Sequence, residues 1–179
     1  MFKKFSKEDI HSKSNIKSSA VRGLKSNLVD QFPGLEPVID EVIPKKATIV
    51  QVKCEDKISV YLMDGEVVAF GKFDELYPSL RLVHKWADCF PSVKVDRGAI
   101  KFVLSGANIM CPGLTSPGAA LPEENLEEGT VVVVNAEGKT NALALGKLLM
   151  STNDIKEKNK GIGIELLTFL GDGVWNFQE

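Results

Sequence analysis

The stretch Val95-Asp-Arg-Gly-Ala-Ile-Lys-Phe-Val-Leu-Ser-Gly-Ala-Asn-Ile-Met-Cys-Pro-Gly-Leu114 decides the fold of its region, because a helix between two strands can be read from it. Asp96 is a residue type that caps helices, so we expect a helix that begins at Arg97. Its apolar residues stand three and four positions apart, which is helical spacing. They are Ile100, Val103 and Leu104. This stripe is expected to face the core of the domain.

Glycine and proline mark the ends of the expected helix and strand in the same stretch. Ser105-Gly106 is expected to end the helix, because glycine readily adopts the left-handed conformation of helix ends. Residues 109–110 restart an apolar run, which Pro112-Gly113 ends. More apolar runs follow downstream. They cover residues 129–134, 142–146, 160–165 and 170–175.

These pieces, in this order, resemble the signature of the PUA domain, a small RNA-binding β-barrel. The residues that carry the resemblance are Asp96, Gly98-Ala99, Leu104-Ser105-Gly106-Ala107 and Pro112-Gly113. No single piece is specific, but together they span most of the second half of the chain. The resemblance implies a C-terminal PUA β-barrel over residues 93–179, in which the downstream runs form the remaining strands and the closing segment.

The first half of the chain mixes helices and strands. Its first dozen residues indicate a basic, loosely ordered arm. Helical spacing predicts helices over residues 15–32, 35–43 and 80–86. A β-rich composition predicts a strand over residues 48–54 and alternation predicts one over residues 57–63, which the hairpin signal Asp64-Gly65 joins to a third strand over residues 66–71. We therefore expect an N-terminal pre-PUA α/β domain over residues 1–92 and an α+β fold for the whole chain.

Composition excludes several classes of protein. The chain is 44% hydrophobic and 26% charged, as globular proteins are. No apolar run approaches the roughly 18 residues of a membrane span, so no membrane partner is expected. Cys54, Cys89 and Cys111 are odd in number and far apart, which fits neither a zinc knuckle nor a disulfide framework. These cysteines indicate a reducing cytosol and a cytoplasmic protein.

The sequence contains no set of residues that predicts catalysis. His84 and Cys111 fall in different predicted domains, and a nucleophile needs a base beside it. The run 160–164 has glycines but lacks the residue order of a phosphate-binding loop. Acidic residues run in clusters typical of solvated loops. We expect no catalytic residue, no metal site and no cofactor, and hence a protein that is not an enzyme.

Two groups of residues are candidates for binding RNA. Gly98-Ala99 would let a phosphate approach the start of the helix, or would let the helix pack closely on the barrel; both interpretations stay open. The first group is Arg97, Gly98, Ala99, Lys101, Ser105, Gly106, Pro112 and Gly113. The second is a basic arm and helix, for which a solvated tail is the alternative. It consists of Lys3, Lys4, Lys7, Arg22 and Lys25.

Segments from both halves extend the resemblance to nearly the whole chain. They are Gln31-Phe-Pro-Gly34, Tyr77-Pro-Ser-Leu-Arg-Leu-Val-His-Lys85 and residues 98–118, and they resemble the malignant T-cell-amplified-sequence protein family. That family pairs with the density-regulated protein, and the pair resembles the two ends of the ligatin-type initiation factor. The resemblance implies binding to the small ribosomal subunit, meaning rRNA and possibly tRNA. It also implies release of leftover tRNA and mRNA after termination, and support of reinitiation.

The net charge of −2 is less basic than we expect in this family. Binding to bare RNA through charge alone is therefore expected to be weak, because phosphate contacts supply most of that affinity. A partner chain would then be needed. The alternative function is an RNA-binding accessory subunit of a tRNA- or rRNA-modifying enzyme, since PUA domains are often attached to such enzymes.

Overall fold

The computed structural model describes residues 5–178 and divides them into two compact units. One unit contains residues 5–90 together with residues 173–178. The other contains residues 91–172.

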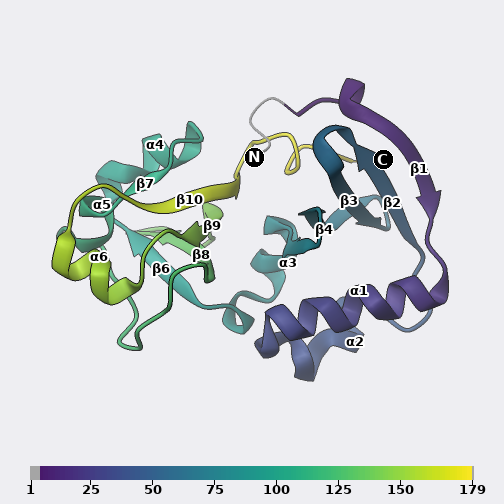
Figure 1. The fold of residues 1–179 in the computed structure, drawn as a ribbon, viewed down its shortest axis with the longest axis horizontal. Coiled ribbons are helices and arrows are strands. Elements are labelled where there is room, and N and C mark those ends of the chain that lie inside the picture. Colours follow the sequence, from purple (N-terminus) through teal and green to yellow (C-terminus); the bar gives the residue numbers. More distant parts are fainter. Residues whose placement is uncertain (1–4, 179) are drawn as a thin grey trace. The chain divides into compact units, whose positions relative to one another are not determined.

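The N-terminal unit is built on a five-stranded antiparallel sheet with its strands in chain order (Figure 1). The strands are β1 (Ile10–Asn15), β2 (Ile49–Cys54), β3 (Ile58–Met63), β4 (Glu66–Lys72) and β5 (Glu75–Pro78). The helix α1 lies along one side of this sheet. The helices are α1 (Ser18–Gln31), α2 (Ile39–Val42) and α3 (Leu80–Lys85).

Local sequence explains most of these elements. The hairpin between β3 and β4 turns at Asp64-Gly65, where φ is +53° and +81°, so the predicted two-residue turn is confirmed. Helix α1 buries Val21, Leu24 and Leu28, as its spacing predicts. Helix α3 begins at a cap, because the Ser79 hydroxyl accepts a hydrogen bond from the Leu82 N–H at 3.1 Å.

Other elements differ from the sequence-based prediction. Residues 10–12, expected to belong to a loose arm, and Asn15, expected to start a helix, instead lie in β1, which pairs with β2. The expected helix over residues 35–43 begins instead as a 3-10 turn, Pro33–Val38, and becomes α-helical only at Ile39. Proline lacks the N–H that an α-helix interior requires, and Pro37 stands inside this turn.

The C-terminal tail completes the N-terminal unit. Val174 and Phe177 are 2% and 5% exposed. The Arg81 guanidinium lies 4.0 Å from the centroid of the Trp175 ring, and its Nη2 donates to the Trp175 carbonyl at 3.0 Å. The run 170–175 was expected to close the C-terminal barrel; the structure instead packs residues 173–178 with residues 5–90.

The C-terminal unit holds a second five-stranded sheet (Figure 1). In spatial order its strands are β6 (Ser92–Val95), β8 (Val131–Ala136), β9 (Ala144–Leu148), β10 (Ile162–Phe169) and β7 (Ile109–Met110). Strands β6 and β8 are parallel and the other neighbours are antiparallel. Three short helices accompany the sheet. They are α4 (Ile100–Leu104), α5 (Pro112–Thr115) and α6 (Thr152–Lys158).

This second sheet curls around an apolar core that includes Val95, Val134, Leu148 and Ile164. Close packing across the sheet requires a glycine on β9, because a Cβ at Gly146 would lie 2.3 Å from the Ile164 Cγ2. The expected architecture, an α+β chain with a mixed N-terminal module followed by a PUA barrel, is confirmed.

Candidate nucleic-acid interface

The helix that follows Asp96 begins and ends as its sequence predicts. It opens with a 3-10 turn, Arg97–Ala99, and continues as α4. The Asp96 Oδ1 accepts the Ala99 N–H at 2.9 Å, which confirms the cap, and the Ser116 hydroxyl donates to the other carboxylate oxygen. Gly106 has φ +88° and its N–H donates to the Val103 carbonyl at 2.9 Å, which confirms the stop.

An apolar groove of about 620 Å³ lies between α4, β7 and α5. Two large apolar side chains stand open to solvent at the groove, since Phe102 is 56% and Met110 is 50% exposed. Small residues line the space beside them. They are Gly98, Ala99, Ala107 and Gly113. Exposed aromatic surface next to small residues is suited to a flat, partly apolar ligand such as a nucleobase.

The small residues also serve the packing of this region. A Cβ placed on Gly113 would lie 3.6 Å from the Ala99 Cβ, so α5 and the start of the helix are in close contact. The Asp96 N–H donates to the Gly113 carbonyl at 3.2 Å. The packing interpretation therefore has support at Ala99, whereas a Cβ on Gly98 would meet only the Asp96 Oδ1, at 3.2 Å.

Carboxylates occupy the start of the same helix. The Ala99 N–H donates to Asp96, and the Arg97 N–H donates to the Glu137 Oε2 at 3.0 Å. A phosphate would have to displace or approach these negative groups. The arrangement thus disfavours phosphate capture at the helix N-terminus and favours contact with a base in the groove.

The two predicted cations of this helix lie in different surroundings. Lys101 is exposed, and its Nζ lies 5.1 Å from the centroid of the Phe102 ring, beside the groove. Arg97 is also exposed, but a Cβ at Gly138 would lie 2.6 Å from its Nη2, so the guanidinium lies against the β8–β9 turn. Of the two cations, Lys101 is therefore the one that lies beside a side chain of the groove.

The structure gathers only part of the first predicted group. Gly98, Ala99, Pro112 and Gly113 line the groove. Arg97, Lys101, Ser105 and Gly106 do not line it; the Ser105 hydroxyl donates to the Phe102 carbonyl at 2.7 Å at the end of the helix.

Sequence reasoning missed Phe102, Ala107 and Met110. The expected apolar stripe also included Leu104, which is 40% exposed. The buried face is centred on Val103, and Leu104 lies about 100° further around the helix, outside that face. Phe102 and Met110 are apolar residues that do not belong to the buried stripe and stand close to glycines in the sequence. That combination was the available signal for an exposed site.

The second predicted group, the basic arm and helix, is only partly accessible. Lys3 and Lys4 lie outside the described residues. Lys7 and Arg22 are exposed. The Lys25 Nζ lies 2.6 Å from the Asp40 Oδ1 with 13% of the side chain exposed, and this contact lowers the pKa of the Asp40 carboxyl. The charge of Lys25 is therefore largely compensated within the unit.

The side chains of Cys54, Cys111 and His84 are packed against other parts of the protein. Burial raises the pKa of the Cys54 thiol to about 11 and also raises the pKa of Cys111, so both thiols stay protonated at neutral pH. The His84 ring packs against the Trp175 ring with centroids 5.3 Å apart and the planes tilted by 60°. Among residues 5–178 no cluster of three His, Cys, Asp or Glu side chains could hold a metal ion. None of the helices in this range has the length and apolarity needed to cross a bilayer.

The sequence matches two described families, the Pre-PUA-like domain over residues 4–86 and the PUA domain over residues 91–170. Translation machinery-associated protein 20 of Saccharomyces cerevisiae is 64% identical over 99% of this chain and 98% of its own length. Malignant T-cell-amplified sequence 2 of Homo sapiens is 47% identical over 99% of this chain and 98% of its own length.

A hypothetical protein from Pyrococcus horikoshii has the same fold in its crystal structure. The TM-score is 0.73 at 24% identity, and the match covers 92% of this chain and 98% of the archaeal one. The order of the two domains, the PUA signature residues and the similarity over the full length all indicate the same family. The chain therefore belongs to the family of the translation machinery-associated protein 20 and malignant T-cell-amplified sequence proteins.

Proposed function

We propose that this protein is a noncatalytic, cytoplasmic translation factor that binds RNA on the small ribosomal subunit. The observation that carries the proposal is the groove between α4, β7 and α5, with Phe102 and Met110 exposed in it and Lys101 beside it. Full-length similarity to proteins named for the translation machinery supports the same setting.

The groove suits an unpaired base better than a duplex. An aromatic face can stack on a base only if that base is not already stacked within a helix. Carboxylates of Asp96 and Glu137 occupy the neighbouring helix N-terminus, so the phosphate backbone would run on the Lys101 side. Single-stranded rRNA, or the free end of a tRNA, fits these requirements.

A second chain completes the proposed activity. With a net charge of −2, the protein gains little electrostatic attraction to RNA. A density-regulated-type partner would add its own contacts and raise the effective concentration of the pair on the ribosome. Together they would release leftover tRNA and mRNA after termination and support reinitiation.

Sedimentation with purified ribosomal subunits tests the first part of this proposal. The protein should co-sediment with small subunits and not with large subunits. Failure to bind small subunits, combined with association with precursor RNA or an RNA-modifying enzyme, would favour the accessory-subunit alternative.

A reconstituted recycling reaction tests the second part. Release of tRNA from post-termination small subunits should be poor with either chain alone and efficient with the pair. Full activity of this chain without its partner would contradict the proposal.

A further inference from the structure

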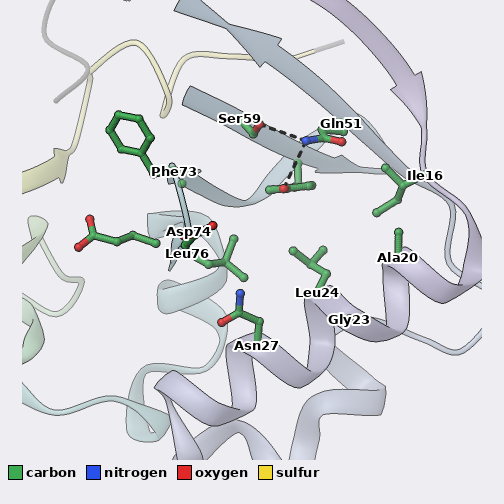
Figure 2. A pocket seen from close by; sticks show the side chains of 13 residues that line it. Ile16, Ala20, Gly23, Leu24, Asn27, Gln51, Ser59, Phe73, Asp74 and Leu76 are labelled. Carbon is green, nitrogen blue, oxygen red and sulfur yellow. Dashed lines mark hydrogen bonds between the residues drawn. The ribbon is translucent and has the colours of Figure 1, made fainter. Parts of the chain in front are cut away.

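A second groove, of about 330 Å³, lies in the N-terminal unit between helix α1 and the sheet (Figure 2). Helix α1 contributes Ala20, Gly23 and Leu24 to its wall. Strands β2 and β3 contribute Gln51 and Tyr61. The groove belongs to a different unit from the RNA-binding candidate and has different chemistry.

Gly23 lines this groove at a position where neither the backbone conformation nor the packing requires a glycine. It lies inside α1, where glycine is less favourable than alanine, and its φ is not in the left-handed region. A Cβ on Gly23 would meet no atom within 4 Å. Gly71, in the same groove, is required by contrast, because a Cβ there would lie 2.0 Å from the Glu75 carbonyl oxygen. The missing side chain of Gly23 widens the groove.

Phe73 stands at the edge of the groove in an unfavourable conformation. It begins the two-residue turn between β4 and β5 with φ +57°, a position where glycine is the usual residue. Its side chain is 74% exposed. A bulky residue with positive φ is uncommon, and such residues concentrate at binding sites. An exposed aromatic is thus presented beside the groove at a conformational cost.

Polar groups on the sheet are arranged to meet a peptide backbone. The Gln51 Nε2 donates to the Ser59 Oγ at 3.1 Å and to the Tyr61 hydroxyl at 3.4 Å (Figure 2). This geometry leaves the Gln51 carbonyl oxygen as an acceptor and the Tyr61 O–H as a donor. Burial raises the pKa of Tyr61, so the hydroxyl keeps its proton. An acceptor and a donor side by side match the N–H and C=O of an extended chain.

The charge of the groove selects the kind of ligand. The charged residues that line it are Asp74 and Glu75. The Glu75 carboxylate accepts a hydrogen bond from the Tyr77 hydroxyl, while Asp74 is exposed at the turn. Carboxylates repel phosphate and attract lysine or arginine. The lining therefore disfavours RNA and favours a basic protein segment.

We propose that this groove docks an extended segment of a protein partner. An apolar or aromatic side chain of the segment packs between Phe73 and Leu24, and a neighbouring lysine or arginine lies next to Asp74. The backbone of the segment bonds to Gln51 and Tyr61. The proposal does not rest on RNA binding by the C-terminal unit, so either can fail without the other.

A random peptide library displayed on phage, selected against the full-length chain, tests the proposal. Enriched peptides should carry an apolar or aromatic residue next to lysine or arginine. Synthetic copies should bind the chain in fluorescence anisotropy, and Gly23→Met should weaken that binding at least about tenfold by filling the groove. Ser26→Met, an exposed position on the same helix that does not line the groove, is the matched control and should bind like the parent.

Two charge-reversal variants, one in the groove and one outside it, give a second, independent measurement. Asp74→Lys should weaken peptide binding about tenfold, whereas Asp30→Lys, exposed and outside the groove, should not. Three results would overturn the proposal: no enriched peptide, enriched peptides without basic residues, or unchanged affinity in correctly folded Gly23→Met and Asp74→Lys. Loss of binding to a labelled oligouridine in these variants, with peptide binding intact, would mean that the groove takes RNA.

Discussion

Replacing Phe102 with alanine should separate RNA binding from stability. An aromatic side chain exposes about 150–250 Å² when fully open, so at 56% exposure about 80–140 Å² of Phe102 is available to a base. Covering that area at about 25 cal/mol per Å² gives a ceiling of about 2–3.5 kcal/mol. Measured base–aromatic stacking contributes about 1–3 kcal/mol, so the dissociation constant for small subunits should rise about 5- to 150-fold.

The assay is a titration of fluorescently labelled protein with purified small subunits, read by anisotropy. The matched control is Leu104→Ala, because Leu104 lies on the same helix, is 40% exposed and does not line the groove. Both variants should unfold close to the parent temperature, since substitutions of exposed residues change stability by only about 0.5 kcal/mol. Equal affinities for the parent, Phe102→Ala and Leu104→Ala would refute the assignment of the groove to RNA.

Three further predictions concern charge, the C-terminal tail and a buried thiol. Lys101→Glu should weaken binding to small subunits and reduce the slope of log K against log salt by about 1, while Arg97→Glu, whose guanidinium lies against Gly138, should have the smaller effect; equal losses would contradict this. Phe177→Ala should lower the free energy of unfolding by about 3 kcal/mol and speed hydrogen exchange in α3 and β4; faster exchange in β8–β10 instead would be the wrong result. The protonated Cys54 thiol should contribute stability fully below pH 9.0 and lose that contribution as the pH rises towards about 11, so Cys54→Val should lose less stability than the parent over that range in chemical unfolding. Parallel losses in both proteins would argue against a role for Cys54.

Periodicity predicted the elements that have one buried face. Helix α1 repeats its buried residues at helical spacing and strand β3 alternates, whereas strands β2 and β4 are recognisable as runs rich in β-branched and apolar residues. Strand β1 lacks this signal, because five of its six residues are exposed and polar side chains occupy both faces. Helix α6 is hidden for the same reason, since Thr152 and Ile155 are its buried residues and the rest are polar.

The sequence predicted the backbone conformation of the candidate site, but it did not predict which side chains form the contact surface. Asp96 caps the helix and Gly106 ends it with a positive φ, and this local chemistry leaves a readable pattern in the sequence. Phe102 and Met110 belong to the contact surface because their side chains are exposed. Whether a side chain is exposed depends on how other elements of the fold pack around it, which the local sequence does not show. The destination of residues 173–178 was unreadable for a related reason: an apolar segment at a chain end does not encode which core it will join.

The tail has a consequence for the order of events during synthesis. Residues 174–177 fill part of the unit formed by residues 5–90, yet residues 91–172 are made in between. At about 5–20 residues per second, roughly 4–16 s pass between completion of the two pieces on the ribosome. The C-terminal domain is made during that interval, while the N-terminal domain waits for residues 174–177. The N-terminal domain, although it is made first, is therefore completed only after the whole C-terminal domain has been synthesised, and a nascent chain stopped before residue 174 would leave its N-terminal domain unfinished.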